Sequence, residues 1–151
     1  MEILSGIFHH GIIVDSIDTA MADITRATGA TWSSVRAFDP LRVWTPEHGR
    51  GEAHLRVAYS RTGPVRMELV ETPQGSPYDA LRTGDMSHIG VWVDNVGDAL
   101  DELCAQGWQI LLAGASPRHR HGSMAYIRRD DGPVIELVGQ ELLPMLAEWW
   151  A

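Results

Sequence analysis

The hydrophobic and polar positions of this chain follow the same pattern twice. Runs rich in β-branched residues, Ile7–Val14 and Ile89–Val93, predict a strand at the start of each half. A polar stop follows each run, and Asp18 and Asn95 are the candidate N-caps of two short amphipathic helices. Each helix is expected to end at a glycine, because glycine adopts left-handed backbone angles without strain. These glycines are Gly29 and Gly107.

Three further strands are predicted after each helix. Turn residues separate the runs, and Arg61–Pro64 and Asp130–Pro133 supply a hairpin turn in each half. The first half also carries a longer insertion, Asp39–Glu52, with two prolines and two glycines. The order strand, helix and three strands, repeated twice, predicts an α+β fold. The expected strands are Thr31–Phe38, His54–Ser60, Val65–Glu71, Gln109–Leu112, Ser123–Arg129 and Val134–Val138.

The two halves also resemble each other residue by residue. His9–Ile17 aligns with His88–Val96 at a constant offset of 79. Gly63–Val70 recurs, one residue shorter, as Gly132–Val138. Two matches in the same order indicate a duplication rather than chance. We therefore expect two packed βαβββ modules, a linker rich in Pro, Gly and Ser, and a C-terminal helical tail. These are residues 6–72 and 86–139 for the modules, 73–85 for the linker and 140–151 for the tail.

Composition narrows the class of function. The chain has 151 residues and a net charge of −8 at pH 7, so neither nucleic acid nor an anionic membrane surface is an expected partner. No apolar run approaches the roughly 20 residues of a membrane span, and the opening residues do not resemble a secretory signal. Cys104 is the single cysteine, which excludes an internal disulfide and suits a reducing interior. We expect a cytoplasmic protein that binds a small molecule.

The duplication places one histidine near the start and one glutamate near the end of each half. Alternate residues of a strand share a face, so Glu136 would lie on an otherwise apolar face. A buried, ionised carboxylate is unfavourable unless a cation or hydrogen-bond donors compensate its charge. Two imidazoles and two carboxylates form a ligand set that suits Zn, Ni, Co, Mn or Fe. The candidate ligands are His9, Glu68, His88 and Glu136.

Structural alternatives exist at these positions. A single histidine at the start of a strand is more often bonded to the backbone, and it is the repeated pairing with glutamate that favours a metal site. His10 adjoins His9 but would point to the opposite face of the strand. Glu71 competes with Glu68 on the same strand, because the extra residue Arg66 could form a bulge that changes the register.

The motif His-x-Gly-[Ile/Val]-x-Val-Asp, the short helix and the closing Glu-Leu-Val resemble the vicinal oxygen chelate family over residues 6–138. The resemblance implies that two βαβββ modules curl into a half-barrel around a divalent metal. The order His, Glu, His, Glu is similar to that of bacterial glyoxalase I, and to methylmalonyl-CoA epimerase except that a glutamine there replaces the first acid. Carried over, the four ligand positions fall on His9, Glu68, His88 and Glu136.

The resemblance also implies chemistry next to a carbonyl group. A metal-dependent isomerase, epimerase or lyase is favoured, with Glu136 as the first and Glu68 as the second candidate for the carboxylate that moves a proton. In epimerase-like members a separate glutamate takes part, for which Glu52 is a candidate. A non-haem iron dioxygenase is the second hypothesis, although that class uses two histidines and one glutamate. A metal-free binding or resistance protein is the third, although such members generally lose the ligands.

The C-terminal tail is expected to form a short apolar helix over Glu141–Trp150, with Pro144 in its first turn. Trp149 and Trp150 need burial, either on this chain or on a partner. Relatives of this size usually pair, and two terminal indoles would suit an interface, so a homodimer is expected. The alternative is a tail that packs on its own barrel.

Overall fold

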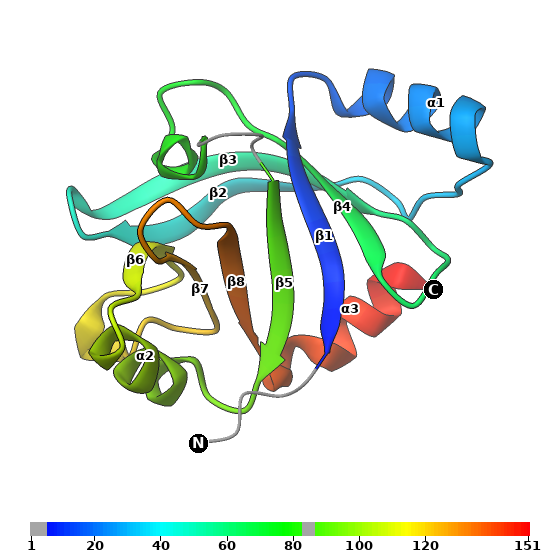
Figure 1. The fold of residues 1–151 in the computed structure, drawn as a ribbon. Coiled ribbons are helices and arrows are strands. Elements are labelled where there is room, and N and C mark those ends of the chain that lie inside the picture. Colours follow the sequence, from blue (N-terminus) through cyan, green and yellow to red (C-terminus); the bar gives the residue numbers. More distant parts are fainter. Residues whose placement is uncertain (1–5, 83–86) are drawn as a thin grey trace.

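The order strand, helix and three strands occurs twice in the computed structural model, which describes residues 6–82 and 87–151 (Figure 1). The end of the expected linker, residues 83–85, and the first residue of the second expected module, residue 86, lie outside the described residues. The elements are β1 (Ile7–Val14), α1 (Ile17–Thr28), β2 (Arg36–Thr45), β3 (Gly49–Tyr59) and β4 (Arg66–Glu71), then β5 (Ser87–Val93), α2 (Val96–Ala105), β6 (Gln109–Ala113), β7 (Met124–Arg128) and β8 (Val134–Gly139).

The eight strands form one closed barrel in the order β1-β4-β3-β2-β6-β7-β8-β5. β1 pairs in parallel with β4, β5 pairs in parallel with β8, and β1 and β5 run antiparallel where the two halves meet. The family resemblance implied a half-barrel, whereas the strands pair all the way round into a closed barrel. β2 and β6 approach each other closely enough to form one residue pair, Trp44 with Ala113, and that pair closes the sheet.

The helices pack on the outside of the barrel, and the largest core lies inside it. Val57 and Leu112 are among the buried side chains of the interior. α1 places the buried Ile17 in a cluster with Leu69 of the first half, and α2 places Leu100 in a second cluster with Leu137 of the second half. α2 buries Leu100 and Leu103 of its predicted apolar face, whereas Met21 and Ile24 of α1 are only partly buried against their cluster. No helix within residues 6–82 and 87–151 is long and apolar enough to cross a membrane.

One predicted helix cap is wrong. Ser16, not Asp18, is the N-cap of α1, because Ser16 still has extended backbone angles while Asp18 already lies in the first helical turn. Asn95 caps α2 as predicted. α1 ends at Gly29 with a φ of 76°, and α2 ends at Gly107 with a φ of 98°, directly after its C-cap Gln106, so both terminating glycines adopt left-handed angles as predicted.

The expected insertion Asp39–Glu52 is instead part of a long hairpin. β2 and β3 continue through it and are joined by a turn at residues 46–48. Pro40 is tolerated because the pairing register shifts between Phe38 and Leu41, and an irregular position has no need of a proline N–H. The predicted strand at residues 31–38 is consequently wrong, since β2 begins five residues later and runs on to the turn.

The C-terminal tail folds back onto the barrel. A 3-10 turn, η3 (Gln140–Leu142), leads into α3 (Leu143–Trp150), which has a proline in its first turn as expected. Trp149 is 5% exposed, and its indole N–H donates to the carbonyl of Ser34 at 2.8 Å. The indole of Trp150 lies 6.0 Å, centre to centre, from the ring of Phe8. Because the tail contacts its own chain, its tryptophans no longer argue for a homodimer.

Candidate metal centre

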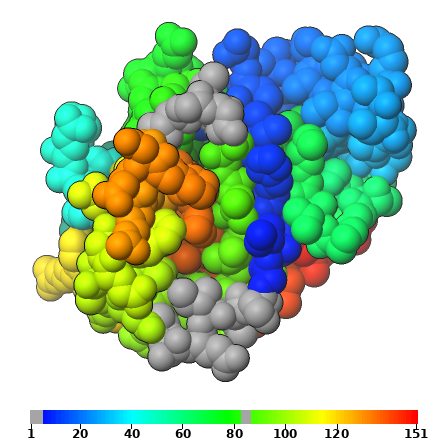
Figure 2. Space-filling model, in the orientation of Figure 1, coloured from blue at the N-terminus to red at the C-terminus, as the bar shows by residue number. Residues whose placement is uncertain are grey.

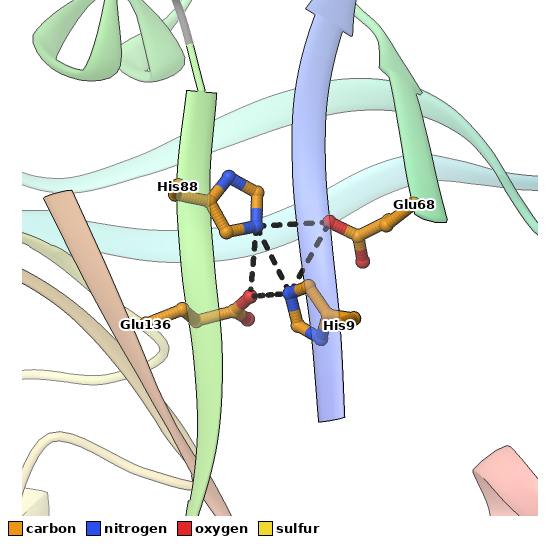
Figure 3. A group of neighbouring side chains, drawn as sticks. All are labelled: His9, Glu68, His88 and Glu136. Atoms are coloured by element: carbon orange, nitrogen blue, oxygen red, sulfur yellow. Dashed lines mark hydrogen bonds and ion pairs between the residues drawn. The ribbon is translucent and has the colours of Figure 1, made fainter. Parts of the chain in front are cut away.

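Four side chains from four strands converge inside the barrel (Figure 3). Each offers one ligand atom, and these atoms all lie within 4.8 Å of one another. All four residues are buried, with exposed fractions between 1% and 7%. The cluster draws one histidine and one glutamate from each half of the chain. Its members are His9 on β1, Glu68 on β4, His88 on β5 and Glu136 on β8.

The glycine two positions after each histidine makes room for the histidine of the other half. In the antiparallel pairing of β1 with β5, His9 lies opposite Gly90 and His88 lies opposite Gly11. A Cβ at Gly11 would lie 2.0 Å from Cε1 of His88, and a Cβ at Gly90 would lie 2.1 Å from Cε1 of His9. No side chain fits in that space. The His-x-Gly spacing is therefore a packing requirement of the cluster.

The donor atoms are spaced like the ligands of one metal ion. Nε2 of His9 lies 3.0 Å from Nε2 of His88 and 2.9 Å from Oε2 of Glu136. Nε2 of His88 lies 3.1 Å from Oε1 of Glu68 and 3.2 Å from Oε2 of Glu136. The distance from Nε2 of His9 to Oε1 of Glu68 is longer, 3.8 Å. Ligands about 2.1 Å from a common ion and at right angles to each other are about 3 Å apart, so the spacing fits a divalent metal.

Two carboxylate oxygens lack an aligned hydrogen-bond donor. Oε1 of Glu68 and Oε2 of Glu136 are buried and have no hydrogen-bond partner among the described residues, although imidazole nitrogens lie at ion-pair distance. Figure 3 shows both oxygens turned toward the two imidazoles. Buried oxygens of this kind are unfavourable without compensation. A cation at the centre of the cluster would satisfy both.

Charge compensation in the metal-free site comes from protonated histidine. Burial lowers the pKa of His88, but contacts with Glu136 and Glu68 outweigh burial and raise it to about 10. Burial raises the pKa of Glu136, but contacts with His88 and His9 outweigh burial and lower it to about 2. A bound divalent ion would replace that proton as the compensating charge, because a metal-binding imidazole is neutral.

Each glutamate has a tyrosine as its cross-strand neighbour. Tyr59 on β3 pairs with Glu68, and Tyr126 on β7 pairs with Glu136. The hydroxyl of Tyr59 donates a hydrogen bond to Oε2 of Glu68. The ring of Tyr126 instead lies edge-on to that of Tyr78, 5.8 Å away centre to centre, and no hydrogen bond joins Tyr126 to Glu136 in the described part of the chain. Burial raises the pKa of both Tyr59 and Tyr126 well above the usual value, so both hydroxyls keep their protons. Sequence reasoning missed these tyrosines.

A cavity of about 440 Å³ opens beside the two glutamates. Its volume falls in the range typical of small-molecule pockets. The short helix η1 (Pro77–Leu81) contributes Tyr78 to the wall, and α3 contributes Trp149. Glu68 and Glu136 are the acidic residues among the described residues of the lining, and most of the others are apolar. The cluster can therefore meet a ligand in the cavity.

The structure places the alternative residues elsewhere. His10 is exposed, whereas its neighbour in the cluster is buried. Glu71 accepts a hydrogen bond from the backbone N–H of Ile17 at 2.7 Å and pairs with Arg56 at 3.4 Å, so its carboxylate serves the start of α1. Glu52 is exposed and lines a cleft on the outside of the barrel instead of the cavity.

Structural comparison shows the same fold in solved proteins. A hypothetical protein from Bacillus halodurans matches with a TM-score of 0.61 and 18% identity, over 89% of this chain and 93% of that chain. Methylmalonyl-CoA epimerase from Mycobacterium tuberculosis matches with a TM-score of 0.57 and 17% identity, over 92% and 91%. A Streptomyces coelicolor methylmalonyl-CoA epimerase variant in complex with 2-nitronate-propionyl-CoA matches with a TM-score of 0.59 and 19% identity, over 90% and 94%.

Sequence comparison identifies the family. No curated protein matches the chain significantly. Residues 8–127, however, match the family model of the Glyoxalase/Bleomycin resistance protein/Dioxygenase superfamily. That match spans most of the chain, including β1, β4 and β5, and it agrees with the resemblance seen in the His-x-Gly motif. The chain therefore belongs to the glyoxalase, bleomycin resistance protein and dioxygenase superfamily.

Proposed function

We propose that this protein is a metal-dependent isomerase or epimerase, or a lyase, that acts on a carbon next to a carbonyl group. The observation that carries the proposal is the convergence of two imidazoles and two carboxylates beside an apolar cavity. His9, Glu68, His88 and Glu136 would hold a divalent ion such as Zn, Ni, Co, Mn or Fe. Such an ion would stabilise the negative charge that develops on a carbonyl oxygen when the adjacent carbon loses its proton.

Glu136 is the proposed catalytic residue that takes up and returns the proton. It lines the cavity, and within the described residues its cross-strand neighbour Tyr126 forms no hydrogen bond with it. Glu68 is the second candidate, but the hydroxyl of Tyr59 holds its carboxylate in place. The apolar wall limits access of water, which strengthens the electrostatic interactions within the site. Similarity to methylmalonyl-CoA epimerases supports epimerisation as the reaction class to test first, on an acidic thioester.

Metal content gives the first test. Elemental analysis of the purified protein is expected to show about one divalent ion per chain, bound by the four side chains of the cluster. The double variant His88→Ala/Glu136→Ala is expected to contain none. The single variant His10→Ala is the matched control, because that histidine adjoins the cluster in sequence but is exposed. Full metal content in the double variant would contradict the proposed ligands.

Proton exchange gives the second test. The metal-loaded enzyme, incubated in deuterated water with an α-acidic thioester or a hemithioacetal, is expected to introduce deuterium at the α-carbon. Glu136→Gln should abolish this exchange. Oxygen consumption by an iron-loaded enzyme without exchange would instead support a dioxygenase. Undiminished ligand binding by the metal-free protein, with neither activity, would support a binding or resistance protein.

We also propose a homodimer, formed by a surface other than the tail. Ile7 and Val65 are large apolar side chains that are 49% and 46% exposed. Figure 2 shows β1, the strand that begins with Ile7, and β5 at the surface between α1 and α2. Exposed apolar side chains suit an interface between copies. Sedimentation equilibrium is expected to give the dimer mass, and the monomer mass would refute the proposal. We further propose that the protein is cytoplasmic.

A further inference from the structure

The wall of the 440 Å³ cavity is apolar around the two glutamates and carries a cationic side chain at its exposed end. Glu68 and Glu136 mark the inner end, where the neighbouring side chains are buried and apolar. Arg42 marks the outer end, because it is exposed and also lines a cleft of about 570 Å³ on the outside of the barrel. It is the one cationic residue among the described residues that line the cavity. A ligand whose reacting end is at the glutamates would thus leave the cavity past a guanidinium.

The guanidinium of Arg42 is free to bind a ligand. Within the described part of the chain it forms no hydrogen bond or ion pair, and its cross-strand neighbour Glu52 is not within ion-pair distance. The acidic Glu52 and the basic residues Arg50 and His119 line the same outer cleft. This group of basic side chains contrasts with the net charge of −8 of the whole chain. An unpaired arginine at the mouth of an apolar cavity is suited to a carboxylate, phosphate or sulfonate.

We infer that the substrate is an amphiphilic anion, with an apolar body inside the barrel and an anionic group at Arg42. The inference rests on the proposed function only for the position of the reacting end, at Glu68 and Glu136. The apolar body follows from the cavity wall, because burying apolar surface there is favourable and few polar groups are present to bind a hydrophilic body. The anionic group follows from the unpaired charge at the outer end.

The C-terminal helix sets the room available to the apolar body. Met145 on α3 lines the cavity yet is 41% exposed, so it lies at the edge of the opening. Leu143 lies on the same helix with the same exposed fraction but does not line the cavity. A larger side chain at Met145 should therefore narrow the cavity, and the same change at Leu143 should not.

Two fluorescent probes test both parts of the inference on the intact protein after incubation with a divalent metal. Anilinonaphthalene sulfonate combines an apolar aromatic body with an anionic group, and N-phenylnaphthylamine has a similar body without the charge. Both are expected to bind with saturation at one site, and the sulfonate should bind more tightly. Arg42→Gln should weaken the sulfonate probe about threefold to fivefold and leave the neutral probe unchanged. Arg50→Gln is the control, since Arg50 lines only the outer cleft.

The cavity itself is tested by the pair on α3. Met145→Trp should weaken both probes about tenfold, because the indole occupies part of the space that they need. Leu143→Trp should weaken neither. Circular dichroism of each variant verifies that the fold is retained.

Three results would overturn the inference: no saturable binding of either probe, equal effects of Arg42→Gln and Arg50→Gln, or equal effects of the two tryptophan substitutions. Metal content, measured on the same samples, separates this inference from the proposed function. Protein that contains metal and exchanges protons but binds no probe contradicts the inference alone. Protein that binds both probes as expected but takes up no metal contradicts the proposed function alone.

Discussion

The two halves of the barrel supply equivalent residues to the candidate metal centre but hold them differently. Each half contributes a histidine, a glycine two residues later, a glutamate and a tyrosine across from that glutamate. In the first half the tyrosine, Tyr59, is bonded to Glu68. In the second half the ring of Tyr126 contacts that of Tyr78, and Glu136 accepts no hydrogen bond from a tyrosine among the described residues. A duplicated backbone thus provides one anchored carboxylate and one freer carboxylate, which suits a fixed ligand and a proton carrier.

The segments that cover the two tyrosines also differ. The ring of Trp149 on α3 lies 5.0 Å from that of Tyr59, and the ring of Tyr78 on η1 lies 5.8 Å from that of Tyr126. η1 follows the first half of the chain but covers a tyrosine of the second, and α3 follows the second half but covers a tyrosine of the first. Each half therefore completes the surroundings of the other's glutamate.

The largest effect is expected from removing the indole of Trp149, which packs against Tyr59 of the first half. Trp149→Ala deletes a buried indole and its hydrogen bond to Ser34, and should lower the free energy of unfolding by about 3–5 kcal/mol. Leu143→Ala on the same helix is the control and should change it by about 0.5 kcal/mol or less, because that side chain is exposed. Urea denaturation measures both. Similar values for the two variants would mean that α3 is not part of the core.

The next largest effect is expected at the two glycines. Gly11→Ala and Gly90→Ala each place a methyl group where an imidazole lies, so each should weaken metal binding about 100-fold or more. Gly51→Ala is the control, because the nearest atom to its added Cβ is 3.5 Å away. Competition with a chelator measures the affinities. Equal losses are expected, and a clearly unequal pair would show that the halves are not equivalent at their histidines.

A smaller effect should distinguish the two tyrosines. Tyr59→Phe removes the hydrogen bond that orients Glu68, and loss of such a supporting contact typically weakens metal binding about 10- to 100-fold. Tyr126→Phe removes an equivalent ring hydroxyl that does not bind a glutamate, so its metal affinity should change less. Competition with a chelator measures the metal affinity of the two variants, each of which lacks one oxygen atom of the parent. Equal losses would contradict the distinction between anchored and freer carboxylates.

The sequence could predict which histidines and glutamates come together because the duplication pairs them. The offset between the halves singled out His9 over His10, and the shared Glu-Leu-Val singled out Glu68 over Glu71; the structure brings the first of each pair into the cluster. The same comparison could have revealed the tyrosines, since Tyr59 and Tyr126 precede the repeated glutamates by nine and ten residues. Their roles could not be predicted, because the partner of Tyr126 comes from η1, a segment without a counterpart in the repeat.

Errors arose where local signals competed with tertiary contacts. Prolines and glycines in Asp39–Glu52 indicated an insertion, but pairing between β2 and β3 holds most of this segment in strands, with Pro40 at an irregular position and Pro46 in the turn. Closure of the barrel depends on the single pair Trp44 and Ala113, which no periodicity specifies. Trp149 is buried where it lines the cavity of its own barrel, and that cavity exists only in the folded chain.

The smallest effect is expected at the helix caps, where the halves differ once more. The start of α1 has two side-chain acceptors: Oγ of Ser16, which accepts from Thr19 N–H at 3.3 Å, and Oε2 of Glu71, which accepts from Ile17 N–H at 2.7 Å. At the start of α2, Oδ1 of Asn95 accepts from Asp98 N–H at 2.9 Å. Asn95→Ala should lower the free energy of unfolding by about 1 kcal/mol, and Ser16→Ala by only about 0.5 kcal/mol, because Glu71 still satisfies one donor of α1. Urea denaturation measures both. The double variant Ser16→Ala/Glu71→Gln should lose at least as much free energy of unfolding as Asn95→Ala loses. If the double variant loses no more than Ser16→Ala alone, Glu71 does not stabilise α1.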